Sequence, residues 1–98
     1  MSSNYKIEVT LSKKRAGDLE SVLLKGNQWR LSDIVTDAIA EQAGRSVVLT
    51  IKRRRDALDM LSAALNDVQM GGETLDGRAY GEIERAFNDA FLVRLKAN

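Results

Sequence analysis

The chain has 98 residues, of which 44% are hydrophobic and 30% charged, so it is suited to one small folded domain rather than to a disordered segment. It contains neither cysteine nor histidine, which excludes disulfides and thiolate zinc sites and removes the commonest catalytic base. The formal net charge is +1, and the sequence has neither an apolar signal core nor a run near the roughly 18 apolar residues of a membrane span, so we expect a cytoplasmic protein without a membrane segment.

The first predicted element is a short strand in "KIEVTL", residues 6–11. Its apolar and polar residues alternate, which is typical of a strand with one buried face (Ile7, Val9 and Leu11 against Lys6, Glu8 and Thr10). Apolar residues then recur at three- and four-residue spacing, which predicts an amphipathic helix over 13–25 (Ala16, Leu19, Val22 and Leu23). Gly26 and Asn27 suit the end of that helix.

A second helix is predicted in "LSDIVTDAIAEQAG", residues 31–44. Ser32 is the expected N-cap, Asp33 places a carboxylate near the positive end of the helix dipole, and Gly44 suits the residue after the helix. The apolar face is formed by Ile34, Val35, Ala38, Ile39 and Ala43. Trp29, in the connection before it, fits either core packing or an exposed partner contact.

The same order of elements then begins again. "SVVLTI", residues 46–51, alternates like the first strand, and a third helix follows, with Leu58, Leu61, Leu65 and Val68 on its apolar face and Gly71-Gly72 after it. A turn around Asp76-Gly77 precedes the last helix, whose apolar face is Tyr80, Ile83, Phe87, Ala90, Phe91 and Leu95. The aromatic residues of this helix are expected to belong to the core rather than to a stacking surface.

Strand-helix-helix therefore occurs twice, in repeats 5–44 and 46–95 of one domain spanning 1–98. One such unit leaves its strand edges and its apolar helix faces uncovered, whereas two units can pair their strands. The sequence predicts a mostly helical α+β fold, with a two-stranded antiparallel ribbon over four helices. The inward residues of both strands would cover the helical core, and the polar residues of the ribbon would remain exposed.

In its strand, helix, glycine turn and "LSDIVTDAI" stretch, the chain resembles the ribbon-helix-helix DNA-binding family, whose members include bacterial, phage and plasmid repressors. That family normally works as a dimer of single units, so the resemblance implies a tandem form with both units in one chain. It further implies sequence-specific binding of double-stranded DNA, as a transcriptional repressor or as an accessory protein in plasmid transfer or partition.

The resemblance also implies which residues would contact DNA. The ribbon residues would read bases in the major groove (Lys6, Glu8, Thr10, Val48, Thr50 and Lys52). Phosphates would be held at the start of the second helix of each unit (Ser32 and Asp33, then Gly77 and Arg78). Because the exposed residues of the two strands differ, the preferred DNA site should be asymmetric.

Two basic triplets add to this hypothesis from the residues themselves. Lys13-Lys14-Arg15 and Arg53-Arg54-Arg55 lie where helices are predicted to begin, which is the unfavourable end of the dipole for cations. Phosphate contacts beside the ribbon would explain them, and a solvated first turn is the alternative. Residues 1–55 contain 11 Lys/Arg and 6 Asp/Glu, whereas residues 56–98 contain 4 and 8, so the basic charge lies in the half with both strands.

Other functions have weaker support in the sequence. Asp33 and Asp37 share a helical face but are expected to be a solvated pair rather than a metal site, and no constellation supports catalysis or a cofactor. The second hypothesis is a protein-interaction module on the same fold, which would dock a partner through its acidic C-terminal helices and would not bind DNA. With DNA as the partner, we expect a monomeric pseudo-dimer or a higher assembly on DNA.

Overall fold

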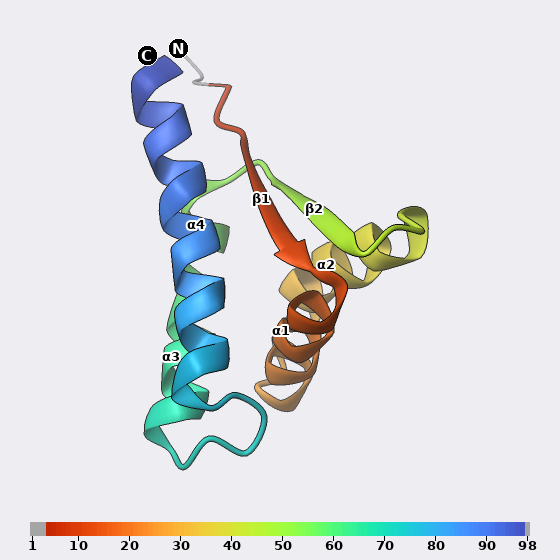
Figure 1. The fold of residues 1–98 in the computed structure, drawn as a ribbon, viewed down its shortest axis with the longest axis vertical. Coiled ribbons are helices and arrows are strands. Elements are labelled where there is room, and N and C mark those ends of the chain that lie inside the picture. Colours follow the sequence, from red (N-terminus) through yellow and green to blue (C-terminus); the bar gives the residue numbers. More distant parts are fainter. Residues whose placement is uncertain (1–3, 98) are drawn as a thin grey trace.

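A computed structural model describes residues 4–97, apart from the side chain of Ala97. The chain forms strand β1 (Ile7–Ser12), helices α1 (Lys13–Lys25) and α2 (Trp29–Glu41), strand β2 (Ser46–Ile51) and helices α3 (Arg54–Gln69) and α4 (Gly77–Ala97). Figure 1 shows the two strands side by side, with α3 and α4 on one side and α1 and α2 on the other. The predicted α+β fold with strand-helix-helix repeated twice is confirmed.

The two strands pair antiparallel, with Val9 opposite Leu49 at the centre of the register. Alternation places one face of the ribbon against the helices, and its residues are almost completely buried (Ile7, Val9, Leu11, Val47, Leu49 and Ile51). Below them lies the core of the domain, in which the largest fully buried side chain is Phe87 of α4. The predicted inward face of both strands is therefore confirmed.

The two units interlock about a pseudo-twofold arrangement. Helix α4 of the second unit lies along β1, and helix α2 of the first unit lies against β2. The buried positions of the first helices also correspond, since Ala16 and Leu19 of α1 match Ala57 and Met60 of α3. This order and pairing are consistent with a tandem ribbon-helix-helix-like fold.

The first helix of each unit ends in the same way. After α1, Asn27 adopts a left-handed backbone with φ 58°, and the Gln28 N–H donates to the Leu23 carbonyl at 2.8 Å. After α3, Gly71 has φ 118°, and the Gly72 N–H donates to the Asp67 carbonyl at 2.9 Å. Both are Schellman-type turns that satisfy the last carbonyls of a helix. The predicted stops at Gly26-Asn27 and Gly71-Gly72 are confirmed.

The limits of α2 differ from the prediction. The helix begins at Trp29, three residues before Ser32, because the turn at Asn27 leads directly into it and Leu31 is needed in the core. Ser32 is buried inside the helix, where its hydroxyl donates to the Trp29 carbonyl at 2.8 Å, so its assignment as N-cap was wrong. Gly44 was also wrong as the terminating residue, since α2 ends at Glu41 and passes into extended backbone at Gln42.

The exposed and buried aromatic residues are now distinguished. Trp29 is 60% exposed, which decides between its two alternatives in favour of the surface. Phe87 is fully buried, and Tyr80 and Phe91 are partly buried against the core, as predicted for the apolar face of the last helix. No helix in the described part of the chain is long and apolar enough to cross a membrane.

Candidate nucleic-acid interface

The outer face of the ribbon carries short side chains and is directed away from the core. Two cross-strand pairs lie at its centre, Glu8 opposite Thr50 and Thr10 opposite Val48. Glu8, Thr10 and Thr50 are exposed, and Val48 is half-buried. Lys6 and Lys52 are exposed just beyond the Ile7–Ile51 pair. The structure thus brings together on one surface all six residues predicted to read bases.

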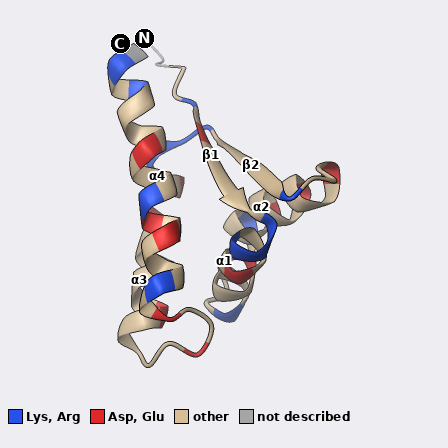
Figure 2. Ribbon diagram, viewed as in Figure 1, with Lys and Arg blue, Asp and Glu red and all other residues tan. Residues whose placement is uncertain are grey.

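Basic residues flank this surface at both ends, as Figure 2 shows. At one end lie Lys13, Lys14 and Arg45, and the Lys13 N–H donates to the Arg45 carbonyl at 2.8 Å, which continues the ladder by one pair. At the other end lie Lys6, Lys52, Arg53 and Arg54. We call these groups the Lys13 cluster and the Lys6 cluster. The strands have six residues each, so the clusters are separated by roughly 20 Å of ribbon.

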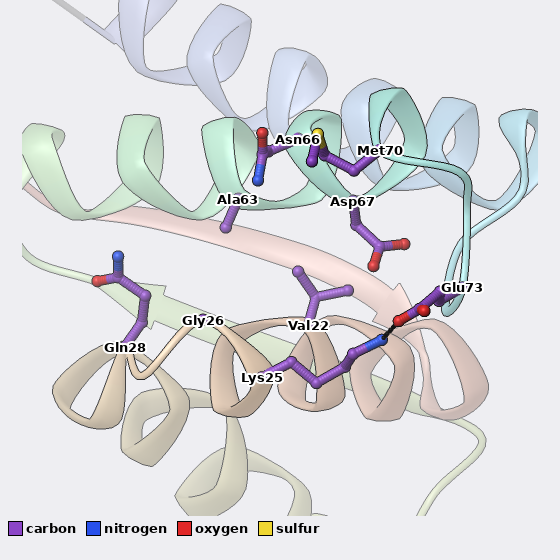
Figure 3. A pocket seen from close by; sticks show the side chains of 9 residues that line it. All are labelled: Val22, Lys25, Gly26, Gln28, Ala63, Asn66, Asp67, Met70 and Glu73. Atoms are coloured by element: carbon purple, nitrogen blue, oxygen red, sulfur yellow. Dashed lines mark hydrogen bonds and ion pairs between the residues drawn. The ribbon is translucent and has the colours of Figure 1, made fainter.

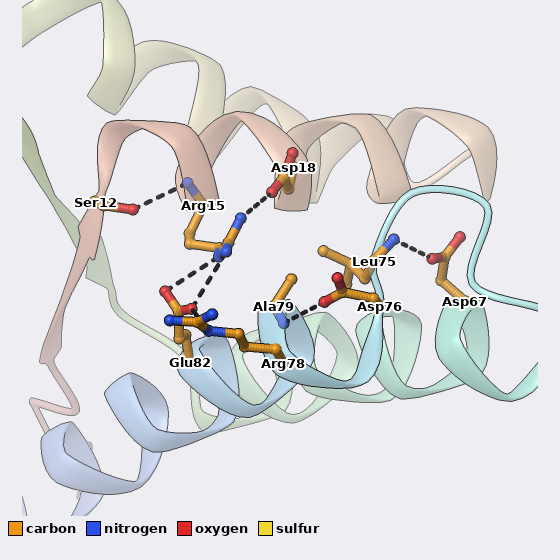
Figure 4. Close-up of polar contacts among 9 residues, drawn as sticks. All are labelled: Ser12, Arg15, Asp18, Asp67, Leu75, Asp76, Arg78, Ala79 and Glu82. Atoms are coloured by element: carbon orange, nitrogen blue, oxygen red, sulfur yellow. Dashed lines mark hydrogen bonds and ion pairs between the residues drawn. The ribbon is translucent and has the colours of Figure 1, made fainter.

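The members of the basic triplets are not equivalent. Lys13 and Lys14 are exposed in the first turn of α1, and Arg53 and Arg54 are exposed at the start of α3. Arg15 instead turns toward α4, where its Nε and Nη2 each donate to the Glu82 carboxylate at 3.2 Å, and its Nη1 donates to Asp18 at 3.0 Å (Figure 4).

These hydrogen bonds, above all those to Glu82, raise the pKa of Arg15. Its guanidinium is therefore committed within the protein. In the second triplet, Arg55 lies on the first turn of α3 and pairs loosely with Asp59 at 3.8 Å.

The start of α4 is already occupied by a carboxylate. The Asp76 Oδ1 accepts from the Ala79 N–H at 2.7 Å (Figure 4). The Asp76 carbonyl accepts from the Tyr80 N–H at 3.0 Å. The side-chain cap satisfies one of the N–H groups that could bind an anion, and it places a negative charge at this helix start. Gly77 is the first residue of α4, and the adjacent Arg78 is exposed and lies 3.8 Å from Glu82.

The start of α2 differs from that of α4. It has no side-chain cap, since Gln28 makes no capping hydrogen bond. Asp33 is exposed in the second turn, whereas Ser32 is buried and cannot present its hydroxyl to a phosphate. Of the four residues predicted at the two helix starts, only Asp33, Gly77 and Arg78 are on the surface.

Two further groups near the ribbon were not predicted. Asp89 and Val93 of α4 line a groove with Glu8 and Thr10, so a second carboxylate lies beside the outer face. Arg45 was also missed, although its position directly before the second strand could have indicated it. Asp76 could have been predicted as a cap, because it is an N-cap residue type directly before a helical pattern.

A separate hollow of about 300 Å³ lies between the end of α1 and the face of α3. Figure 3 shows that the Lys25–Glu73 ion pair, 2.6 Å long, lies at one end of it. Asp67, which also lines it, accepts from the N–H groups of Thr74 and Leu75 at 3.2 and 2.8 Å. These polar groups fix the loop before α4. Among residues 4–97, no group of three Asp or Glu side chains could hold a metal ion.

Comparisons of this chain with protein-family models, with curated proteins and with solved structures found no match.

Proposed function

We propose that the chain binds double-stranded DNA by inserting the outer face of its ribbon into the major groove. The observation that carries this proposal is the combination of a polar ribbon surface with a basic cluster at each of its ends. A two-stranded ribbon fits a major groove about 12 Å wide, and flanking lysines and arginines are suited to the phosphates on either side. In this proposal the protein is a member of the ribbon-helix-helix family in tandem form and acts as a repressor or plasmid transfer or partition accessory protein.

The structure supports a reduced set of contacts compared with the sequence hypothesis. Phosphate contacts are assigned to the Lys13 cluster and to Arg53 and Arg54 of the Lys6 cluster, whereas Lys6 and Lys52 stay among the residues assigned to base reading. Arg15 is engaged by Glu82, and Ser32 is buried. The four central residues assigned to base reading differ between the strands, since β1 contributes Glu8 and Thr10 and β2 contributes Val48 and Thr50. A carboxylate can accept from cytosine N4 and a valine can contact a thymine methyl, so the two half-sites should differ in sequence.

The proposal is tested by fluorescence anisotropy with duplexes selected from a random pool, at several salt concentrations. We expect affinity to fall steeply with salt, because phosphate contacts release counterions. The double variant Lys6→Ala/Thr50→Ala should lose most of the preference for the selected duplex over a random one and retain its melting temperature, because both side chains are exposed. The absence of salt-sensitive binding to any duplex would disprove the proposal, and unfolding of the double variant would disprove the exposed position of these two residues.

A second function, protein interaction without DNA binding, is favoured by one specific observation. The last turns of α4 expose three large apolar residues in addition to the acidic Asp89 beside the ribbon (Leu92, Val93 and Leu95). Such residues are typical of a partner contact. The same salt titration distinguishes the two functions, because only DNA binding requires the basic clusters.

A further inference from the structure

The two free edges of the ribbon are treated differently by the protein. At the edge of β2, the side chain of Gln42 pairs with the backbone of Val48: its Nε2 donates to the Val48 carbonyl, and its Oε1 accepts from the Val48 N–H, both at 2.9 Å. A carboxamide that makes both bonds imitates one residue of a neighbouring strand. The β2 edge is therefore closed by the protein itself at this position, as natural proteins often do with exposed strand edges.

The corresponding position on β1 is Glu8. In an antiparallel pair, residues alternately direct their N–H and C=O groups toward the partner strand and away from it. The backbone N–H and C=O of Val48 point away from β1, because they bond Gln42. The backbone groups of its partner Thr10 therefore point away from β2, and so do those of Glu8, two residues earlier. The hydrogen bond from the Lys13 N–H to the Arg45 carbonyl agrees with this alternation, since it shows that odd-numbered residues direct their backbone groups toward the partner strand. The backbone of Glu8 thus faces α4.

Helix α4 does not close this edge with a carboxamide, as Gln42 does at Val48. The buried residues Val35 of α2 and Ile83 of α4 occupy matching positions, and the same spacing of 48 residues matches Gln42, directly after the end of α2, with Ala90 inside the longer α4. A methyl group cannot replace a carboxamide. Within the described residues, no side chain bonds to the backbone of Glu8.

A groove remains where the missing carboxamide would lie. It has a volume of about 380 Å³ and is lined chiefly by Lys6, Glu8, Thr10, Ala90, Val93 and Arg94. A hollow of about 280 Å³ shares Glu8, Thr10, Ala90 and Val93 with it and extends it toward Ala86 and Asp89. The alanines of α4 allow a backbone to approach β1 closely. Lys6 and Arg94 make one end of the groove basic, and Asp89 makes the other end acidic.

We infer that this groove between β1 and α4 binds an extended peptide segment of a protein partner, which adds to the β1 edge through main-chain hydrogen bonds to Glu8. The bound amide takes the role that the Gln42 carboxamide has at Val48, so the ligand chemistry is already present once in the molecule. Strand addition to a sheet edge obtains affinity from main-chain bonds and specificity from the side chains. The charges of the groove favour a segment with an acidic residue near Lys6 and Arg94 and a basic residue near Asp89.

The test begins with a phage-displayed library of random dodecapeptides, selected on the wild-type protein. The affinity of an enriched peptide is then measured by anisotropy on the wild type, on Ala90→Gln and on Gln42→Ala. We expect Ala90→Gln to weaken binding at least about tenfold, because its carboxamide occupies the edge of Glu8 and the peptide must replace it. Gln42→Ala opens the opposite edge and should leave the affinity for this groove unchanged, so it is the matched control.

A second variant keeps the test decisive if Ala90→Gln does not fold. Glu8→Pro removes the N–H that faces α4 and leaves the bonds to β2 intact, since proline is tolerated where a strand N–H is unpaired. Glu8→Pro should also weaken binding at least about tenfold. In the wild-type protein, bound peptide should slow hydrogen exchange of the Glu8 N–H but not of the Val48 N–H. The inference is overturned if no peptide is enriched, or if the enriched peptides bind the folded variants as tightly as the wild type. None of these measurements depends on DNA binding.

Discussion

Two ion pairs connect the halves of the molecule from the equivalent third residues of α1 and α3, but with opposite polarity. The third residue of α1 is Arg15, which bonds Glu82 of α4, whereas the third residue of α3 is Asp56, which bonds Arg30 of α2. Each pair joins the first helix of one unit to the second helix of the other. The comparison shows that a link at this place is formed with either charge on the first helix.

The two links differ in burial, and this difference sets their expected energies. The side chain of Asp56 is 4% exposed and receives both Nη atoms of Arg30, at 2.6 and 3.0 Å. The side chain of Glu82 is 48% exposed. The hydrogen bonds from Arg30 lower the pKa of Asp56 despite its burial. In both pairs the guanidinium belongs to the first unit and the carboxylate to the second, and the carboxylate is the buried member of one pair and the more exposed member of the other.

The largest expected effect tests whether the core is shared equally between the units. Phe87 of α4 is fully buried, and its counterpart Ile39 of α2 is only partly buried. Phe87→Ala should lower the free energy of unfolding by about 3–5 kcal/mol, because it removes a buried ring and leaves a cavity. Ile39→Ala should cost about 1–2 kcal/mol, because part of its side chain is already in water. Urea denaturation measures both, and equal losses would contradict the central position of α4 in the core.

The next effect concerns the two ion pairs. Asp56→Asn should lower stability by about 2 kcal/mol near neutral pH, the magnitude of a charge-assisted hydrogen bond to a largely buried group. Because the folded-state pKa of Asp56 is lowered, its contribution is present above the unfolded pKa of about 4 and is lost as the pH falls through the folded value. Urea denaturation from neutral to acid pH should therefore give a shallower pH dependence for Asp56→Asn than for the wild type.

Glu82→Gln is the matched control for this pair. It should cost less than about 1 kcal/mol, because its carboxylate is half in solvent, where ion pairs contribute little. If Glu82→Gln destabilises the protein as much as Asp56→Asn does, burial does not distinguish the two links.

Much of the fold follows from local sequence patterns. The strands were predictable, because the alternation in "KIEVTL" and "SVVLTI" is typical of a half-buried strand. The limits of α1 were predictable from the three- and four-residue spacing of its apolar residues and from the glycine turn after it. The start of α2 was not predictable in this way. Ser32 is a residue type that commonly caps helices, but the helix begins at Trp29, one turn earlier, and buries Leu31 in the core. Here tertiary packing overrides a local capping preference.

The candidate site was predictable to a smaller extent. The exposed ribbon residues follow from the same alternation that identifies the strands. The commitment of Arg15 to Glu82, 67 residues later in the chain, has no local signal, because it depends on how the units interlock. The open edge at Glu8 depends on the same arrangement. The pairing of Gln42 with Val48 spans only six residues and depends on the path of the chain between α2 and β2. Spacing within one element therefore identifies which residues are exposed, but not which of the exposed residues remain free.

The smallest effect on stability should accompany a measurable effect on DNA binding. Lys13→Ala and Lys14→Ala alter exposed residues, so each should change the free energy of unfolding by no more than about 0.5 kcal/mol. If each lysine contacts one phosphate, each substitution should reduce the slope of log affinity against log salt by about 1. Arg15→Ala is the internal comparison, since the ion pair with Glu82 should leave the slope nearly unchanged. A slope that falls as much in Arg15→Ala as in the lysine variants would mean that Arg15 leaves Glu82 for a phosphate, and that the link between α1 and α4 opens when DNA binds.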